Sequence, residues 1–199
     1  MKYIIISLLA ILFSGCITTT TPAKSEFRVN SHMPSKKFTS LGCKNKSLKV
    51  AQAFSQNSIM SHTMSYAQGD FKQYAYSASQ WSTAPNRAIT AEFLTMIRNS
   101  KLFKSVQISK SRSKNDFILE ISIEDFMQYF NSNSTSSYAN VVISLALIDS
   151  KTNSVFATKI FNAKVDVKSL DAKGGVDGLN SALSDILSQS NDWLGEVCK

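Results

Sequence analysis

Residues 117–130 read FILEISIEDFMQYF, and residues 138–149 read YANVVISLALID. In the first stretch large apolar residues fall at every second position from Phe117 to Ile123, which is the period of a strand with one buried face. The second stretch repeats this pattern from Val141 to Leu147. A turn is expected at residues 149–153, after which residues 155–165 return as a hairpin partner. This most regular part of the chain therefore predicts long, paired strands.

Shorter strands are expected upstream. Residues 63–81 read TMSYAQGDFKQYAYSASQW and predict two strands, because Gly69 can supply the turn between them. The stretches 48–51 and 103–108 predict one strand each, and residues 26–29 predict a short edge strand.

Two segments have the period of amphipathic helices. Pro85 suits a first helical turn, and apolar residues recur from Ile89 to Ile97 at helical spacing, so this helix should end near Asn99. The second helix is expected over residues 176–197, and KGGVDG at 173–178 is interpreted as the turn that enters it. Its largely apolar face consists of Val176, Leu179, Leu183, Ile186, Leu187, Ser190 and Leu194.

These elements predict an α+β fold, with a single-layer sheet of about six mostly antiparallel strands and two amphipathic helices packed on one face. The other face would be left to solvent or to a partner. A length of 199 residues suits one domain, expected at residues 48–199. Residues 1–15 are expected to be a lipoprotein signal peptide, and residues 16–47 an acylated N-terminus and tether.

The start of the chain predicts export. Lys2 is followed by an apolar run over residues 3–13, which suits a signal peptide and is too short for a transmembrane helix. Ser14 and Gly15 then lead into Cys16, an order that resembles the bacterial lipobox, although phenylalanine stands where leucine is usual. The resemblance implies diacylglycerol and an N-acyl chain, such as palmitate, on this cysteine. The alternative is an ordinary signal peptide with a chance cysteine.

Acyl chains on Cys16 would hold the mature chain on a membrane almost permanently, at about 0.8 kcal/mol per buried methylene. Ile17 follows the cysteine, where an aspartate would favour the inner membrane by resemblance to enteric sorting signals. We therefore expect a lipid-anchored protein of the outer membrane of a Gram-negative bacterium, facing the periplasm. No cofactor is expected besides the covalent acyl groups.

Two cysteines, Cys43 and Cys198, would remain in the exported chain besides Cys16. An even count in an oxidising compartment predicts a disulfide between them. The alternative is two free thiols that lie too far apart to bridge.

The stretch QYAYSASQWSTAPNRAITAEFLTMIRNSKLFKSVQI, residues 73–108, resembles the ABC-type transport auxiliary lipoproteins, the PqiC-like family associated with MCE systems. In that family a tyrosine-containing strand leads to a tryptophan, a proline-started helix and a Phe–x–x–Val strand. The strand at 117–130 and the closing helix with its Trp–Leu pair also resemble the family, so the likeness covers about residues 48–194. The landmarks are Tyr74, Tyr76, Trp81, Pro85, Phe103, Val106, Trp193 and Leu194.

This resemblance implies a non-enzymatic part of an envelope lipid-transport system. An inner-membrane ABC transporter would work with an MCE-domain protein that bridges the periplasm, and the lipoprotein would receive the tip of that protein at the outer membrane. A ring-shaped homo-oligomer and contact with phospholipid remain open. Tyr74, Tyr76 and Trp81 would form a partner or lipid surface, unless they are core aromatics of the sheet.

The chain has a formal net charge of +8. In an exported protein this charge favours anionic lipid headgroups or acidic proteins as binding partners over nucleic acid. The alternative is a soluble surface that is rich in lysine. One basic group flanks the strand at 103–108 and would meet anionic headgroups, unless it is a solvated loop. Its members are Lys101, Lys104, Lys110, Arg112 and Lys114.

No residue pattern indicates catalysis. His32 and His62 are the two histidines, and no metal-ligand spacing, nucleophile motif or glycine-rich phosphate loop occurs. Glu124 and Asp125 are adjacent in a strand, so we expect them to point to opposite faces rather than to act as an acid–base pair. The prediction is a protein that is not an enzyme and holds no metal. The alternatives are a stand-alone structural or surface-exposed lipoprotein that binds envelope components or host factors, and a periplasmic enzyme subunit.

Overall fold

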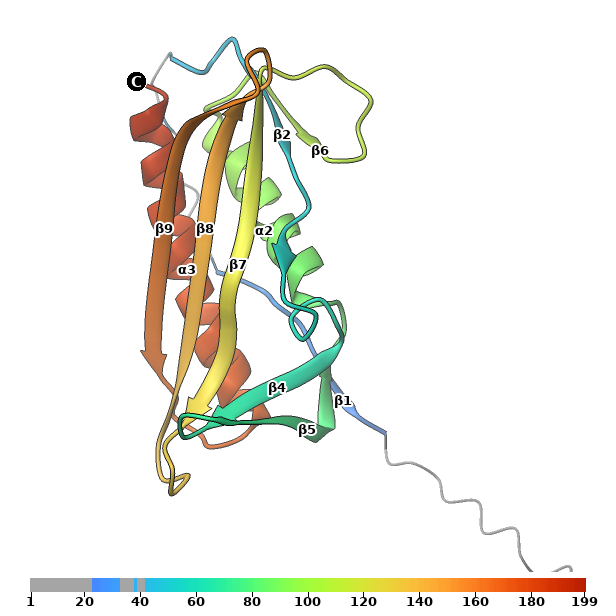
Figure 1. Cartoon of the computed structure of the whole chain (residues 1–199), viewed down its shortest axis with the longest axis vertical. Helices are drawn as coiled ribbons and strands as arrows, with labels where there is room; N and C mark the ends of the chain where they lie inside the picture. Colours follow the sequence, from blue (N-terminus) through green and yellow to red (C-terminus); the bar gives the residue numbers. More distant parts are fainter. Residues whose placement is uncertain (1–22, 33–37, 39–41) are drawn as a thin grey trace, which may run out of the picture.

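The computed structural model describes residues 23–32, 38 and 42–199 (Figure 1). These residues form one nine-stranded sheet and two helices, α2 (Pro85–Ser100) and α3 (Ala172–Val197), which confirms a mixed α+β fold. The sheet has more strands than the about six expected. β1 (Ser25–Phe27) corresponds to the short edge strand expected at residues 26–29, whereas the two-residue β3 (Phe54–Ser55) was not expected. The other strands are β2 (Ser47–Val50), β4 (Thr63–Gln68), β5 (Lys72–Trp81), β6 (Ser105–Ile108), β7 (Phe117–Phe130), β8 (Ser137–Asp149) and β9 (Ser154–Asp166).

Strand β7 organises the sheet. One of its edges pairs with β8 along the whole strand, and β8 pairs with β9. Its other edge pairs in turn with β2, β3 and β4. The sheet is completed by β5 beside β4, β1 beside β5, and β6 beside β2. Three short strands thus share one edge of a long strand.

The prediction of mostly antiparallel strands holds only for β7–β8–β9 and for the β4–β5 hairpin. The pairings β1–β5, β2–β6, β2–β7, β3–β7 and β4–β7 are parallel. Parallel neighbours need a crossover between them, and here the chain that leads from β2 to its parallel neighbour β6 includes α2. The alternation of side chains predicts a strand but not the direction of a neighbour that is distant in the sequence.

Both helices lie on the same face of the sheet, as predicted (Figure 1). Their expected apolar faces are buried, including Ile89 and Phe93 in α2 and Leu183 and Leu187 in α3. Together with the alternating positions of β7 and β8 they form one hydrophobic core.

Helix α3 begins at Ala172, so the interpretation of KGGVDG as a turn before the helix is wrong. The backbone N–H of Gly174 donates to the carboxylate of Asp171, which caps the helix at 2.8 Å. A Cβ atom on Gly178 would lie 2.9 Å from both Ala139 Cβ and Val167 Cγ2. This glycine therefore permits the close approach of the helix to β8, rather than a turn.

A β-bulge in β7 corrects the prediction for Glu124 and Asp125. Ile123 pairs with Ile143 and Asp125 pairs with Val142, which leaves Glu124 without a partner on β8. Ile123 and Phe126 are both buried in the core, and the two carboxylates line one hollow on the side of the sheet away from the helices. The extra residue of a bulge shifts the side-chain alternation by one position, so neighbouring residues can share a face.

Candidate functional site

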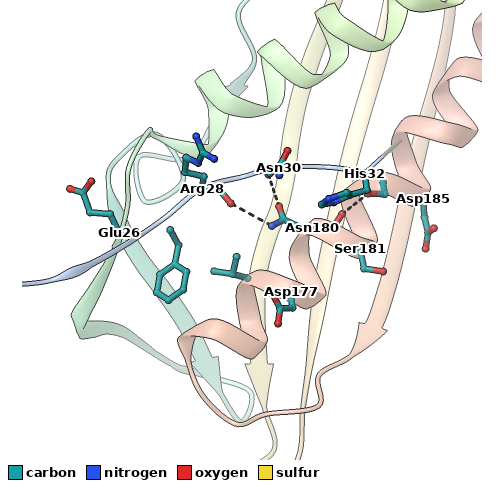
Figure 2. Close-up of a pocket in the computed structure, with 11 residues that line it drawn as sticks. Glu26, Arg28, Asn30, His32, Asp177, Asn180, Ser181 and Asp185 are labelled. Atoms are coloured by element: carbon teal, nitrogen blue, oxygen red, sulfur yellow. Dashed lines mark hydrogen bonds between the residues drawn. The ribbon is translucent and has the colours of Figure 1, made fainter. Parts of the chain in front are cut away.

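The chain between β1 and the helices forms a strap, defined here as residues 28–32. The side-chain amide of Asn180 in α3 binds it twice (Figure 2): the backbone N–H of Asn30 donates to Oδ1 at 3.0 Å, and Nδ2 donates to the carbonyl of Arg28 at 3.4 Å. The hydroxyl of Ser31 donates to the carboxylate of Glu92 in α2. Residues that the sequence analysis assigned to a tether are thus fastened to both helices.

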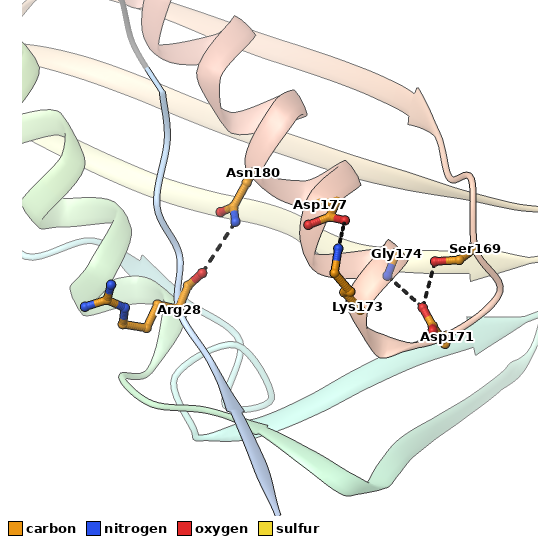
Figure 3. Close-up of polar contacts among 7 residues, drawn as sticks. All are labelled: Arg28, Ser169, Asp171, Lys173, Gly174, Asp177 and Asn180. Carbon is orange, nitrogen blue, oxygen red and sulfur yellow. Dashed lines mark hydrogen bonds and ion pairs between the residues drawn. The ribbon is translucent and has the colours of Figure 1, made fainter.

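A groove of about 650 Å³ lies between the strap and α3, and its labelled side chains carry charges of both signs (Figure 2). Asp177 forms an ion pair with Lys173 at 2.6 Å (Figure 3). The carboxylate of Asp171 accepts hydrogen bonds from the backbone N–H of Gly174 and the hydroxyl of Ser169. These hydrogen bonds hold the pKa of Asp171 below its usual range. Both side chains of the Lys173–Asp177 pair are largely exposed, so the pair adds little stability. The groove is the place where the N-terminal segment docks on α3.

The three aromatic residues expected at a partner surface differ in how far they are buried. Trp81 is 3% exposed and packs against Phe126, so it is a core residue. The hydroxyl of Tyr76 donates to Gln128 Oε1 at 2.8 Å, and burial raises the pKa of this tyrosine. Tyr74 is exposed and stacks on Tyr66, with ring centroids 5.5 Å apart. Of the three, only Tyr74 offers a large exposed ring.

Sequence reasoning missed Phe71, which lies in the turn of the β4–β5 hairpin and is 98% exposed. A phenylalanine directly after Gly69 and Asp70 was an available signal, because turns normally carry polar residues. Gly69 has φ +61° and makes the turn, as predicted.

The predicted basic group gathers around β6. Lys101 and Lys104 precede this strand, the other three members follow it, and all five side chains are exposed. The backbone N–H of Lys104 donates to the carbonyl of Lys46, which adds Lys44 and Lys46 to the same end of the domain. Within the described ranges none of the five predicted members forms a salt bridge. Figure 1 places this basic end where β7 begins, away from β1.

Asp125 is a partly buried carboxylate on the outer face of the sheet. Its Oδ2 accepts hydrogen bonds from the Tyr129 hydroxyl at 2.9 Å and from Asn140 Nδ2 at 2.7 Å. Desolvation raises the pKa of Asp125 in spite of these donors, and it also raises the pKa of Tyr129. The three residues form a structural polar network, in which the Asp125 carboxylate accepts the hydrogen bonds of both donors, Tyr129 and Asn140.

Replacing Asp125 by asparagine is expected to leave the protein as stable as the wild type, or more stable, at pH 7. Because folding raises the pKa of this acid, its contribution to stability is present below the ordinary Asp pKa of about 3.9 and is lost as the pH rises through the folded pKa. The difference in melting temperature between Asp125→Asn and wild type should therefore shrink towards pH 4. Circular dichroism melts between pH 4 and 8 measure this.

Asp116 is the matched control, because folding lowers the pKa of this carboxyl instead of raising it. Its Oδ2 accepts from the backbone N–H and the hydroxyl of Ser47, both at 2.7 Å, and these bonds lower its pKa. Its stabilisation is present above the ordinary pKa and is lost as the pH falls through the folded pKa, so Asp116→Asn should destabilise at pH 7. A larger loss at pH 7 from Asp125→Asn than from Asp116→Asn would contradict this assignment.

Cys43 and Cys198 are joined in a disulfide in the structure, with Cα atoms 5.2 Å apart. Both residues are buried. A Cβ atom on the neighbouring Gly42 would lie 2.0 Å from the carbonyl oxygen of Cys198, so the absence of a side chain lets the two segments meet. The bond fastens the C-terminus of α3 to the chain just before β2.

Cys16 and the signal peptide lie outside the described residues. Within the part of the chain that the structure describes, no helix is long and apolar enough to span a membrane. Across the same residues no group of three or more His, Cys, Asp or Glu is placed to hold a metal ion.

Comparison with known proteins shows the fold. No protein-family model and no curated protein matches the sequence. The crystal structure of protein XCC0632 from Xanthomonas campestris, of the family DUF330, matches with a TM-score of 0.77 at 14% identity, over 87% of this chain and 96% of that one. An uncharacterised protein matches with a TM-score of 0.64 at 9% identity, over 86% and 98%. At these identities the likeness extends to the chain fold alone.

Proposed function

We propose that this chain is a lipid-anchored protein of the outer membrane, facing the periplasm, that serves as a non-catalytic docking component of an MCE-type ABC lipid-transport system. The lipobox-like sequence at Cys16 supplies the anchor, and the sequence resemblance to the auxiliary lipoproteins supplies the system. The likeness of the fold to that of XCC0632 is compatible with this assignment. Binding energy rather than bond chemistry would be its contribution.

The observation that carries the proposal is that the attachment of the N-terminal segment and the basic residues lie at different ends of the domain. β1 is the first strand after the expected anchor at Cys16, and the basic end of the domain lies away from it (Figure 1). Ser25 is nine residues after Cys16, and nine extended residues span at most about 32 Å. An anchor at Cys16 would therefore keep β1 near the membrane and leave the basic end directed towards the periplasm. An acidic surface of the MCE-domain protein is the complementary partner.

Replacing Cys16 by serine is expected to abolish incorporation of labelled palmitate and to move the protein out of the outer-membrane fraction. The reason is that the acyl chains would be attached to this cysteine, and the described residues contain no helix long and apolar enough to span a membrane. Metabolic labelling and sucrose-gradient fractionation of envelopes measure both effects, with Ser14→Ala as the control next to the cysteine. Unchanged sedimentation with the outer membrane would contradict lipid anchoring as the means of attachment.

The docking role is tested by affinity purification of the tagged, lipidated protein from gently solubilised envelopes, followed by mass spectrometry. We expect an MCE-domain protein with its permease and ATPase, and we expect their recovery to fall at least tenfold in Lys101→Glu/Lys104→Glu. Lys72→Glu/Lys168→Glu, which reverses two exposed lysines outside the basic group and so has the same charge change, is the control. Purification without such partners would instead favour the stand-alone lipoprotein.

The edge strand β9 bears on self-association. Within the described residues it pairs with β8 alone, and its Ile160 and Phe156 side chains are more than half exposed. An unpaired edge with apolar side chains is the kind of surface through which copies of one chain associate. Analytical ultracentrifugation of wild type and Ile160→Lys tests a homo-oligomer, which should dissociate in the variant if it forms through this strand.

A further inference from the structure

A cleft of about 330 Å³ opens between α2 and the ends of β2 and β6. Its apolar lining comes from Val50, Leu94 and Ile108, one residue from each of these three elements. Ile108 is 47% exposed, although it is a large apolar residue at the end of a strand. The volume lies at the lower end of the range for small-molecule sites, about 300–1,000 Å³.

Hydrogen bonds hold the walls of this cleft in place. The backbone N–H of Ala53 donates to the hydroxyl of Thr90 at 2.9 Å, which ties the chain after β2 to α2. The guanidinium of Arg98 donates to the carbonyl of Val106 at 3.2 Å, which ties β6 to the same helix. The cleft is therefore bounded by fixed elements rather than by loops alone.

The charge of the cleft is one-sided. Arg87 in α2 and Lys110 after β6 both line it, and no acidic side chain of the described residues does. Neither cation has a carboxylate partner among the described residues. The other two hollows contain acidic residues. Asp177 and Asp185 line the groove beside the strap, and Glu124 and Asp125 line the hollow beside the hairpin.

We infer that this cleft binds a single-chain amphiphile with one anionic headgroup, such as a fatty-acid carboxylate. The apolar floor takes the acyl chain, whose burial removes apolar surface from water at about 25 cal/mol per Å². Arg87 and Lys110 hold the carboxylate by charge-assisted hydrogen bonds. A cleft of this volume suits one acyl chain better than two. The inference goes beyond the docking role and does not depend on it.

The test uses the full-length lipidated protein in non-ionic detergent and a photoactivatable diazirine analogue of decanoate. Peptide mapping is expected to find the label on α2 and on residues near Ile108, with at least a tenfold excess of unlabelled decanoate removing it. Decyltrimethylammonium, which has the same chain and the opposite charge, should not compete. Competition by both compounds, or label scattered over the surface, would overturn the inference.

Two variants separate the headgroup site from the floor. Arg87→Gln/Lys110→Gln is expected to reduce labelling at least tenfold, whereas Lys104→Gln/Lys114→Gln removes the same charge outside the cleft and should change labelling less than twofold. Ile108→Ser keeps both cations, shortens the floor and should also reduce labelling. Equal losses in the two charge variants would mean general attraction to the basic end and would refute a site. Far-ultraviolet circular dichroism checks that each variant is folded.

Discussion

Replacing Cys43 and Cys198 together by alanine is expected to lower the free energy of unfolding by up to about 5 kcal/mol. The disulfide joins residues that are 155 positions apart, and a bond across so long a loop restricts the unfolded chain strongly. Both cysteines are buried, so the variant also loses packing at the C-terminus of α3. Urea denaturation of wild type and variant, followed by circular dichroism, measures the difference.

Reductant supplies the control for this prediction. It should shift the denaturation midpoint of the wild type towards that of the variant and leave the variant unchanged. Intact mass after alkylation, with and without prior reduction, reports whether the bond is present in the exported protein. Two thiols that are alkylated without reduction would contradict the disulfide, and a loss below 1 kcal/mol would contradict its importance.

Gly178→Val is expected to cost about 3 kcal/mol of unfolding free energy. The added Cβ would lie 2.9 Å from Ala139 Cβ, on a central strand that cannot move aside, and the two further methyl groups crowd the same space. Helix α3 must then tilt away from β8, which opens the core beside it. The loss appears as a lower urea midpoint and as faster hydrogen exchange in α3.

A double variant tests the cause. Ala139→Gly removes one of the two atoms that the new Cβ would meet, so Gly178→Val/Ala139→Gly should recover part of the stability lost in Gly178→Val. Ser181→Val, at an exposed position of the same helix, controls for the effect of a β-branched residue in α3 and should change stability by less than 1 kcal/mol. Equal losses in Gly178→Val and Ser181→Val would show that the close approach to β8 is unimportant.

The candidate surfaces were only partly predictable. The basic group around β6 could be read from the sequence, because its members are close together along the chain. The union of this group with Lys44 and Lys46 could not, since it depends on the pairing of β2 with β6. Whether Trp81 or Tyr74 reaches the surface was equally inaccessible, because both belong to one strand and only its neighbours bury one of them.

The sequence by itself determined the long strands, the two amphipathic helices, the hairpin at Gly69 and the pairing expected of two cysteines. These follow from local periods, turn residues and a simple count, which act within a few residues or need no geometry. The tertiary structure alone decided which strands run parallel, where the bulge places Glu124 and Asp125, and why Gly178 lies inside α3. Each of these depends on contacts between segments far apart in the chain, and such contacts leave no period in the sequence around any one of them.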